Sequence, residues 1–213
     1  MSTQGAAGSP RELDHWNTRF AAPDYVFGKQ PNAFLAGQAG KRLKPGMGVL
    51  CVADGEGRNS TWLASQGFAV TAFDYSPVGL AKSRALAAER GVQVDLQQGG
   101  INAWDWDAVQ YDAVAAIFIQ FSTPPERARV FAGLVRALKP GGLLILQGYG
   151  TGQPAYGTGG PKNLEQLYTD TLLRGAFAAL DILHLATHDD EVDEGPGHSG
   201  MSALVDLVAR RPA

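Results

Sequence analysis

The sequence contains no cluster of basic residues, only one cysteine, and no apolar run long enough to cross a membrane. Eighteen lysines and arginines stand against 21 aspartates and glutamates, which gives a formal net charge of −3. This balance argues against a nucleic acid or an anionic membrane as the main partner. Because Cys51 has no second cysteine to pair with, a reducing, cytoplasmic setting is indicated.

The N-terminal stretch MSTQGAAGSP is small and polar and lacks the apolar segment of a signal peptide. We expect residues 1–10 to be disordered and residues 11–213 to form a single domain, since this length suffices for one sizeable core. For this domain we expect a small-molecule partner, with no nucleic acid and no membrane, and a monomeric or homodimeric state.

Short apolar segments with strand character alternate with segments of helical periodicity. Ser76 and Pro77 are a helix cap and a first-turn proline, and Gly91 ends that helix. The alternation predicts right-handed crossovers and a mostly parallel sheet. The predicted strands are 48–53, 68–74, 92–98, 111–121 and 143–149, and the predicted helices are 59–66, 77–90 and 124–142, the last ending in Pro-Gly-Gly.

The pattern changes after the fifth predicted strand. A glycine-rich loop over 150–163 precedes a predicted helix over 163–175, and two further strands are predicted at 177–189 and 201–211. The acidic turn between them, DDEVDEGPGHSG, is short, so these strands must be antiparallel. The sequence therefore predicts an α/β, Rossmann-like fold. Its seven-stranded sheet is mostly parallel with an antiparallel last strand and has helices on both faces.

Two glycines follow the first predicted strand, in VLCVADGEGRNS. Gly55 and Gly57 permit a tight turn and a close backbone approach at the carboxyl edge of the sheet, where ligands of open parallel sheets bind. Asp74 ends the next strand, where a carboxylate can accept hydrogen bonds from both hydroxyls of a ribose. This arrangement predicts a ligand that contains a nucleoside.

A dinucleotide is the first alternative for that ligand. Its fingerprint requires a third glycine, and Ser60 occupies that position. Glu56, between the two glycines, is a poor neighbour for a pyrophosphate but a tolerable one for a ligand with an ammonium and a sulfonium.

The segment VLCVADGEGRNSTWLASQGFAVTAFDYSPVGLAKSRALA resembles the cofactor-binding half of class I S-adenosylmethionine-dependent methyltransferases. More narrowly, it is similar to the tellurite-resistance (TehB-type) and thiopurine-methyltransferase-like members. Flanking segments agree, among them HWNTRFAAPDYVFGKQPNAFL and LKPGGLLILQGY, so the resemblance covers roughly residues 14–211. It implies a methyltransferase domain over 11–213 with an N-terminal lid at about 11–45, and S-adenosyl-L-methionine as cofactor, released as S-adenosyl-L-homocysteine.

The resemblance also implies which residues bind the cofactor. The loop of Gly55 and Gly57 wraps the methionyl end, Asp74 holds the ribose, and Tyr75 lies against the adenine. Two positions depart from the family pattern, since Cys51 replaces the usual acidic residue and Ala53 the usual first glycine. The ammonium then depends on backbone carbonyls and Asp54. The full set of expected cofactor-binding residues is Ala53, Asp54, Gly55, Gly57, Arg58, Asn59, Asp74, Tyr75, Ser76, Gly100 and Ile101.

Three segments are expected to meet above the carboxyl edge of the sheet and to bind the methyl acceptor. They are the N-terminal lid, the loop after the fifth strand, and the turn between the last two strands. The expected acceptor-binding residues are Tyr25, Phe27, Tyr149, Gln153 and Tyr156, and the candidates for catalysis are His198, Glu194 and Gln120. The alternative for Tyr25 and Phe27 is that they only fasten the N-terminal arm.

Other conspicuous side chains are assigned structural roles. Trp104 and Trp106 are expected to pack under a loop, and Cys51 is expected to be an inert core thiol. Asp189, Asp190 and Glu191 are expected to form a solvated turn. The remaining histidines have no metal-ligand spacing, so no metal site is predicted.

No buried base motif is apparent, which favours an acceptor that needs little deprotonation. A thiol, with a pKa of about 8.5, is partly ionised near neutral pH. The sequence therefore favours a soft nucleophile, a thiol, selenium or tellurium species. Two rivals stay open: a non-catalytic module that binds the cofactor for regulation, and an NAD(P)-linked Rossmann oxidoreductase, which Ser60 and the missing Tyr-x-x-x-Lys motif disfavour.

Overall fold

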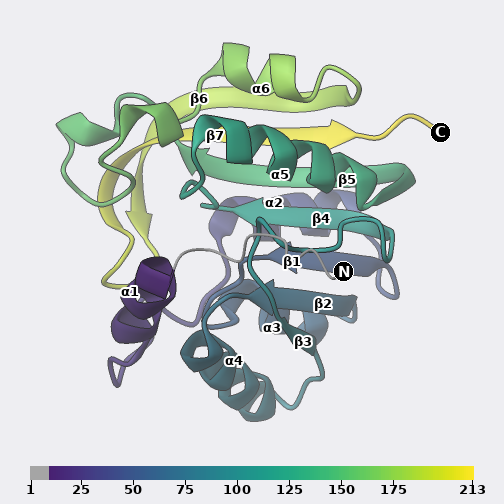
Figure 1. Cartoon of the computed structure of the whole chain (residues 1–213). Helices are drawn as coiled ribbons and strands as arrows, with labels where there is room; N and C mark the ends of the chain where they lie inside the picture. Colours follow the sequence, from purple (N-terminus) through teal and green to yellow (C-terminus); the bar gives the residue numbers. More distant parts are fainter. Residues whose placement is uncertain (1–9) are drawn as a thin grey trace, which may run out of the picture.

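The computed structural model of the chain describes residues 10–213, so the expected disorder of residues 1–9 lies outside the described residues. Pro10, also expected to be disordered, is instead the first residue of helix α1. Seven strands form one sheet in the order β3-β2-β1-β4-β5-β7-β6 (Figure 1). The strands are β1 (Gly48–Val52), β2 (Ala69–Asp74), β3 (Asp95–Gln98), β4 (Tyr111–Ile117), β5 (Leu138–Tyr149), β6 (Asp181–Asp193) and β7 (Ser199–Arg210).

The strand directions agree with the sequence prediction. β1 pairs in parallel with β2 and β4, β2 pairs in parallel with β3, and β4 with β5, whereas β7 is antiparallel to both of its neighbours, β5 and β6. The predicted α/β fold with an antiparallel last strand is confirmed. The helices are α1 (Pro10–Phe20), α2 (Ala33–Arg42), α3 (Arg58–Ser65), α4 (Pro77–Arg90), α5 (Pro124–Arg136) and α6 (Asp170–Ala176), with the short 3₁₀ segments η1 (Gln153–Ala155) and η2 (Leu164–Gln166).

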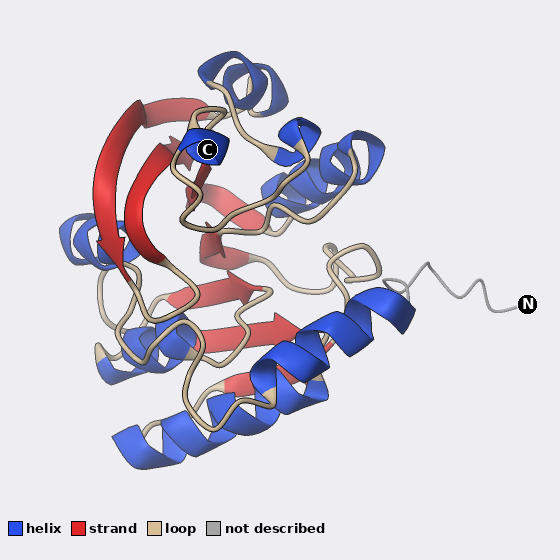
Figure 2. Cartoon of the chain, turned by 90° about the vertical axis from the view of Figure 1, so that its left-hand side faces the viewer, coloured by secondary structure: helices blue, strands red, loops and turns tan. Residues whose placement is uncertain are grey.

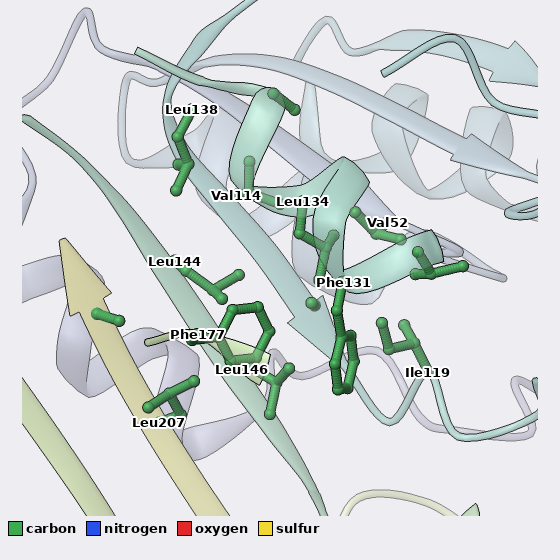
Figure 3. Close-up of a cluster of buried hydrophobic side chains, with 14 of the residues drawn as sticks. Val52, Val114, Ile119, Phe131, Leu134, Leu138, Leu144, Leu146, Phe177 and Leu207 are labelled. Carbon is green, nitrogen blue, oxygen red and sulfur yellow. The ribbon is translucent and has the colours of Figure 1, made fainter. Parts of the chain in front are cut away.

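Alternating side chains of β1 enter two separate cores, because successive residues of a strand point to opposite faces. Val49 and Cys51 pack with residues of α2 and α3. Leu50 and Val52 pack with residues of α5 and α6 on the other face. Figure 3 shows the second core, in which Phe131 and Leu134 of α5 meet strand residues such as Val114 and Leu146. Helices therefore cover both faces of the sheet.

Capping residues determine the ends of α4 and the start of α5, which are the helix boundaries that the sequence predicted most closely. The Ser76 hydroxyl accepts a hydrogen bond from Gly79 N, Pro77 opens α4, and Gly91 ends it with φ 64°. Thr123 and Glu126 form a capping box at α5, which ends at Arg136 because Leu138 already pairs with Tyr111 as the first residue of β5. β4 ends at Ile117, four residues earlier than predicted, because Phe118 adopts φ 55° and leaves the strand conformation.

Two predictions for the C-terminal third are wrong. The helix expected over 163–175 is interrupted, because Tyr168 bridges to Gly150 and Thr169 then caps a new helix, α6, by accepting from Leu172 N. The residues expected to form an acidic turn, 189–191, instead continue β6 and pair with 201–203 of β7, although their side chains are exposed. Trp104 stacks on Phe73 at 3.9 Å, as the packing interpretation predicted. No helix within residues 10–213 is long and apolar enough to cross a membrane.

Candidate active site

A cavity of about 670 Å³ lies at the carboxyl ends of β1, β2 and β4. Its volume is within the range of about 300–1,000 Å³ that small-molecule sites occupy. Helix α1 lies beyond the strand ends toward which these arrows point in Figure 1. Figure 2 looks from that side and shows α1 running beside α4. The cavity thus lies between the sheet edge and an N-terminal cover.

Asp74 fixes the glycine loop through its buried carboxylate. Its Oδ2 accepts from Gly55 N at 2.9 Å, and its Oδ1 accepts from Ser76 N at 2.8 Å. Burial raises the pKa of Asp74 to about 6, against the opposing effect of these backbone donors. Asp74 lines the cavity and shapes its floor. A carboxylate oxygen has two acceptor positions, so each can also receive a ligand hydroxyl.

Backbone conformation explains the residues of the loop itself. Gly55 has φ 60° and lines the cavity. Ala53, at the position of the usual first glycine, adopts φ 48°, a left-handed conformation that is uncommon for a residue with a Cβ. Gly57 is outside the cavity lining, and a Cβ on it would lie 2.1 Å from Ser83 Oγ. Gly57 therefore serves the close packing of α3 on α4, and its contact with a ligand stays a prediction.

Asp54 lines the cavity and has one carboxylate oxygen without a hydrogen-bond partner among the described residues. Its Oδ2 is inaccessible to solvent and has no hydrogen-bond partner among the described residues. Burial raises the pKa of Asp54 to about 7. A buried acceptor without a donor is costly, so this oxygen is suited to a cationic donor of a ligand. Arg58 and Asn59, two of the predicted cofactor-binding residues, also line the cavity.

A second unpaired oxygen belongs to Asn102, which the sequence reasoning missed. Its Oδ1 is buried without a partner, and the residue lines the cavity with Gly100 and Ile101. This amide oxygen belongs to the residue two positions after Gly100. Tyr75 lines the same end of the cavity, whereas the hydroxyl of Ser76, a predicted cofactor ligand, caps α4 and donates to Asn17 Oδ1.

Glu56 does not face the cavity, contrary to the expectation that it would adjoin the ligand. Its Oε2 accepts from Val26 N at 2.8 Å and Phe27 N at 3.3 Å, and its Oε1 lies 2.8 Å from Lys82 Nζ. The Tyr25 hydroxyl donates to Lys82 O at 3.1 Å, outside the cavity lining. Tyr25 therefore fastens the N-terminal arm, which is the structural alternative expected for it, and its contact with an acceptor stays a prediction.

His198 lies at the opposite end of the cavity within a cage of aromatic rings. Its ring centre is 4.5 Å from that of Phe27, 4.3 Å from Phe118 and 5.8 Å from Tyr149. Burial lowers the pKa of His198, an effect that Glu194 opposes. Burial raises the pKa of Tyr149 to about 12. Neither His198 Nδ1 nor the Tyr149 hydroxyl has a hydrogen-bond partner in the described chain.

Glu194, a predicted catalytic residue, is turned away from the cavity. Its Oε2 lies 2.6 Å from Arg58 Nη2 and 3.7 Å from His198 Nδ1, too far for a hydrogen bond to the imidazole. Its Oε1 accepts from Asn32 Nδ2 at 2.9 Å. Burial alone would raise the pKa of Glu194, but His198 and Arg58 lower it to about 2. Glu194 is a positioning residue that holds the β6–β7 turn.

Three other predicted site residues have structural roles. Gln120 lines the cavity, but its amide donates to Tyr149 O at 2.8 Å and Gln166 O at 3.0 Å, and its oxygen accepts from Tyr149 N, so both of its donors hold the backbone. Gln153 is fully buried, accepts from Ala203 N at 2.8 Å and lies outside the cavity lining. Tyr156 is 38% exposed and also outside it.

Helix α1 supplies cavity residues that the sequence reasoning did not assign. His15, Trp16, Arg19 and Phe20 line the cavity at helical spacing, and Trp16 stacks on Phe20 at 5.4 Å between ring centres. The i, i+3, i+4 repetition of large side chains was visible in the sequence. Within residues 10–213, no group of three or more histidine, cysteine, aspartate or glutamate side chains is arranged to hold a metal ion.

Comparison with known proteins agrees with this geometry. Residues 49–142 match the family model described as a methyltransferase domain. Over 103 residues the chain is 33% identical to an uncharacterized protein of Mycobacterium tuberculosis, a match that covers 48% of this chain and 37% of that protein. Over 109 residues it is 34% identical to the ubiquinone biosynthesis O-methyltransferase of Rickettsia conorii, covering 51% and 37%. The matched region is thus well under half the length of these curated relatives.

Solved structures resemble nearly the whole chain. TehB from Haemophilus influenzae superposes with a TM-score of 0.70 at 16% identity, covering 94% of this chain and 67% of that one. The chain shares its fold with solved structures described as methyltransferases. A solved structure concerned with the conversion of a disulfide bond into a thioacetal group during echinomycin biosynthesis superposes with a TM-score of 0.75 at 17% identity. The superposition covers 95% of this chain and 90% of that one. The N-methyltransferase NodS from Bradyrhizobium japonicum, in complex with S-adenosyl-L-homocysteine, reaches 0.69 at 12%, covering 94% and 98%.

Proposed function

We propose that this chain is an S-adenosylmethionine-dependent methyltransferase that acts on a small-molecule acceptor. The observation that carries the proposal is the pair of buried, unpaired oxygens, Asp54 Oδ2 and Asn102 Oδ1, on residues that line the same cavity as Asp74. A cofactor with an ammonium, a ribose and an adenine amino group offers a donor to each of these three acceptors. Gly55 lets the backbone approach the ligand between them.

The residues of this chain would contribute mainly alignment. When bound, the cofactor supplies a methyl group on a sulfonium, so no side chain has to activate a leaving group. Asp54, Asp74 and Asn102 would fix its orientation, and Trp16, Phe27 and Phe118 would exclude water from the acceptor side. Positioning of this kind can lower a barrier by about 7–11 kcal/mol.

Within this activity we propose a soft nucleophile, a thiol, selenium or tellurium species, as the methyl acceptor. The acceptor end of the cavity contains His198 as a neutral base of lowered pKa, while the carboxylate of Glu194 is bound to Arg58. A thiol ionises near neutral pH with little help, whereas an alcohol does not. The resemblance to the TehB-type and thiopurine-methyltransferase-like members supports the same class of acceptor.

Calorimetry with S-adenosyl-L-homocysteine and with NADH tests the cofactor assignment. We expect binding of the first and none of comparable strength for the second; tighter binding of the dinucleotide would refute the proposal. A panel of thiols, thiopurines, selenite and tellurite, followed by formation of S-adenosyl-L-homocysteine, then tests the acceptor. Binding without turnover on a wider panel of oxygen, nitrogen and sulfur acceptors would indicate a non-catalytic module.

A further inference from the structure

Arg19 of α1 lines the cavity and forms no ion pair with a carboxylate of residues 10–213. Its Cζ lies 5.5 Å from the ring centre of Trp16 and 4.9 Å from that of Phe27. Aromatic rings attract a guanidinium over their faces and leave the N–H groups at its edge available for hydrogen bonds. Every ion pair found within residues 10–213 involves a cation other than Arg19.

The two unpaired polar groups near His198 share the Phe27 ring with this guanidinium. Phe27 contacts Arg19 and also packs against His198, whose ring meets that of Tyr149 edge-on. Tyr149 is 2% exposed and His198 8% exposed, and neither the hydroxyl nor Nδ1 has a partner in the described chain. Burial dominates the pKa of both groups, and the charge of Arg19 lowers each.

The acidic residues that line the cavity with Arg19 are Glu12, Asp54 and Asp74. Glu12 is on the same helix but seven residues away, about 10 Å along the axis. Glu194 is paired with Arg58 and lies outside the cavity lining. Arg19, Tyr149 and His198 line the same cavity and are here called the cationic corner. The carboxylate of Glu194 lies 3.7 Å from His198 Nδ1 but is itself paired with Arg58.

We infer that the cationic corner binds an anionic oxygen group, a carboxylate or an oxyanion, of a molecule held in the cavity. The guanidinium edge presents a planar pair of donors that matches two oxygens of such a group. The Tyr149 hydroxyl donates to it, and His198 donates in the tautomer that carries its proton on Nδ1. This inference rests on the proposed function. The anionic group is either the amino-acid carboxylate of the cofactor or a charged group of the methyl acceptor.

Calorimetry with two nucleoside ligands separates these sources. S-adenosyl-L-homocysteine carries the carboxylate, and 5′-methylthioadenosine lacks both it and the amino group. Arg19→Gln removes the charge, and Arg84→Gln removes the same charge from the exposed side of α4, outside the cavity lining. If the cofactor is the source, Arg19→Gln weakens binding of S-adenosyl-L-homocysteine roughly 10- to 100-fold. Binding of 5′-methylthioadenosine then stays unchanged, and Arg84→Gln changes neither.

If the acceptor is the source, binding of both nucleosides survives in Arg19→Gln. The protein saturated with S-adenosyl-L-homocysteine is then titrated with 3-mercaptopropionate and with 2-mercaptoethanol. Arg19→Gln should abolish the preference of the wild type for the carboxylate, and Arg19→Lys should restore part of it.

Two results would overturn the inference. One is an equal loss for both nucleosides, which would mean that Arg19 only supports the cover. The other is an unchanged preference in every titration. A wild type that binds neither nucleoside would refute the proposed function instead. The same thiol titration of the free protein then still decides whether the cationic corner binds a carboxylate.

Discussion

Arg58 Nη2 lies 2.6 Å from Glu194 Oε2, and this pair joins the first turn of α3 to the turn between β6 and β7. The second carboxylate oxygen of Glu194 accepts from Asn32 Nδ2, which also donates to Gln147 Oε1 of β5 at 2.6 Å. One buried carboxylate therefore connects the glycine loop, the N-terminal cover and the sheet. The arrangement explains why the turn that carries His198 stays against the cavity.

Breaking this pair should destabilise the protein strongly. Glu194→Gln leaves Arg58 buried without a counter-charge, so we expect a loss of about 3–5 kcal/mol in the free energy of unfolding. The matched control is Glu89→Gln, which breaks the exposed pair with Lys29, in which the two side chains are 56% and 42% exposed. That control should cost at most about 1 kcal/mol. Urea unfolding of both variants measures the difference, and equal losses would contradict the assignment.

The carboxylate of Glu194 also predicts that the protein loses stability at acid pH. The pKa of Glu194 is lowered to about 2 in the folded chain from an ordinary 4.5, so its ionised form is favoured by folding. Its contribution is therefore complete above pH 4.5 and is lost as the pH falls toward 2. Comparing wild type with Glu194→Gln across pH 2–6 checks this. The stability difference between them should shrink toward the acid end.

Substituting Gly57 by alanine should cost stability through a steric clash, and a control variant separates this clash from backbone strain. Gly57→Ala introduces a Cβ where φ is 87° and where Ser83 Oγ would lie 2.1 Å away. Gly46 has nearly the same φ, 88°, but nothing within 4 Å of a Cβ. Gly46→Ala should therefore show only the strain, about 1 kcal/mol or more. Gly57→Ala should lose at least about 1–3 kcal/mol beyond that in thermal or urea unfolding.

Sequence patterns predicted the sheet and most helix boundaries because local chemistry determines them. Ser76, Pro77 and Gly91 specify the ends of α4 with little help from the rest of the fold. The helix expected over 163–175 was wrong because a tertiary contact decides it. Tyr168 pairs with Gly150, and the periodicity of its own segment does not contain that information.

The cofactor side of the site was easier to predict than the acceptor side, for a related reason. Asp54, Gly55 and Asp74 follow strand ends whose positions the pattern fixes. Gln120 and Gln153 lie in the right region, but their amides are used by backbone groups far away in sequence. Arg19 and Trp16 were missed because the side of the sheet that α1 covers depends on long-range packing.

Asp54 predicts a pH dependence of cofactor binding. Its pKa is raised to about 7 by burial, so a fraction of the free protein carries a neutral carboxyl group at neutral pH. The ammonium of S-adenosyl-L-homocysteine needs the ionised form, so the affinity should fall as the pH is lowered from 8 to 6, by up to about tenfold. Asp54→Asn should bind more weakly at pH 8 and lose most of this dependence. A wild-type affinity that is flat over this range would exclude the role.

His198 tests the nature of the methyl acceptor. His198→Ala removes the only buried imidazole of the acceptor side, which is neutral at pH 7 because burial lowers its pKa. With a thiol, selenium or tellurium acceptor, deprotonation needs little help, so the loss in kcat/KM should stay below about 100-fold. With a hydroxyl or amine acceptor the loss should approach 10³–10⁴-fold, and alkaline pH should recover part of it. Rates of wild type and His198→Ala across pH 6–9, with the best acceptor from the panel, distinguish the two cases.

The control is the folding of the variant. Because Glu194 holds the turn through Arg58 and not through the imidazole, the thermal unfolding of His198→Ala should stay cooperative. A large loss of rate can then be assigned to chemistry. A large loss that high pH repairs would exclude the soft nucleophile and make His198 the general base.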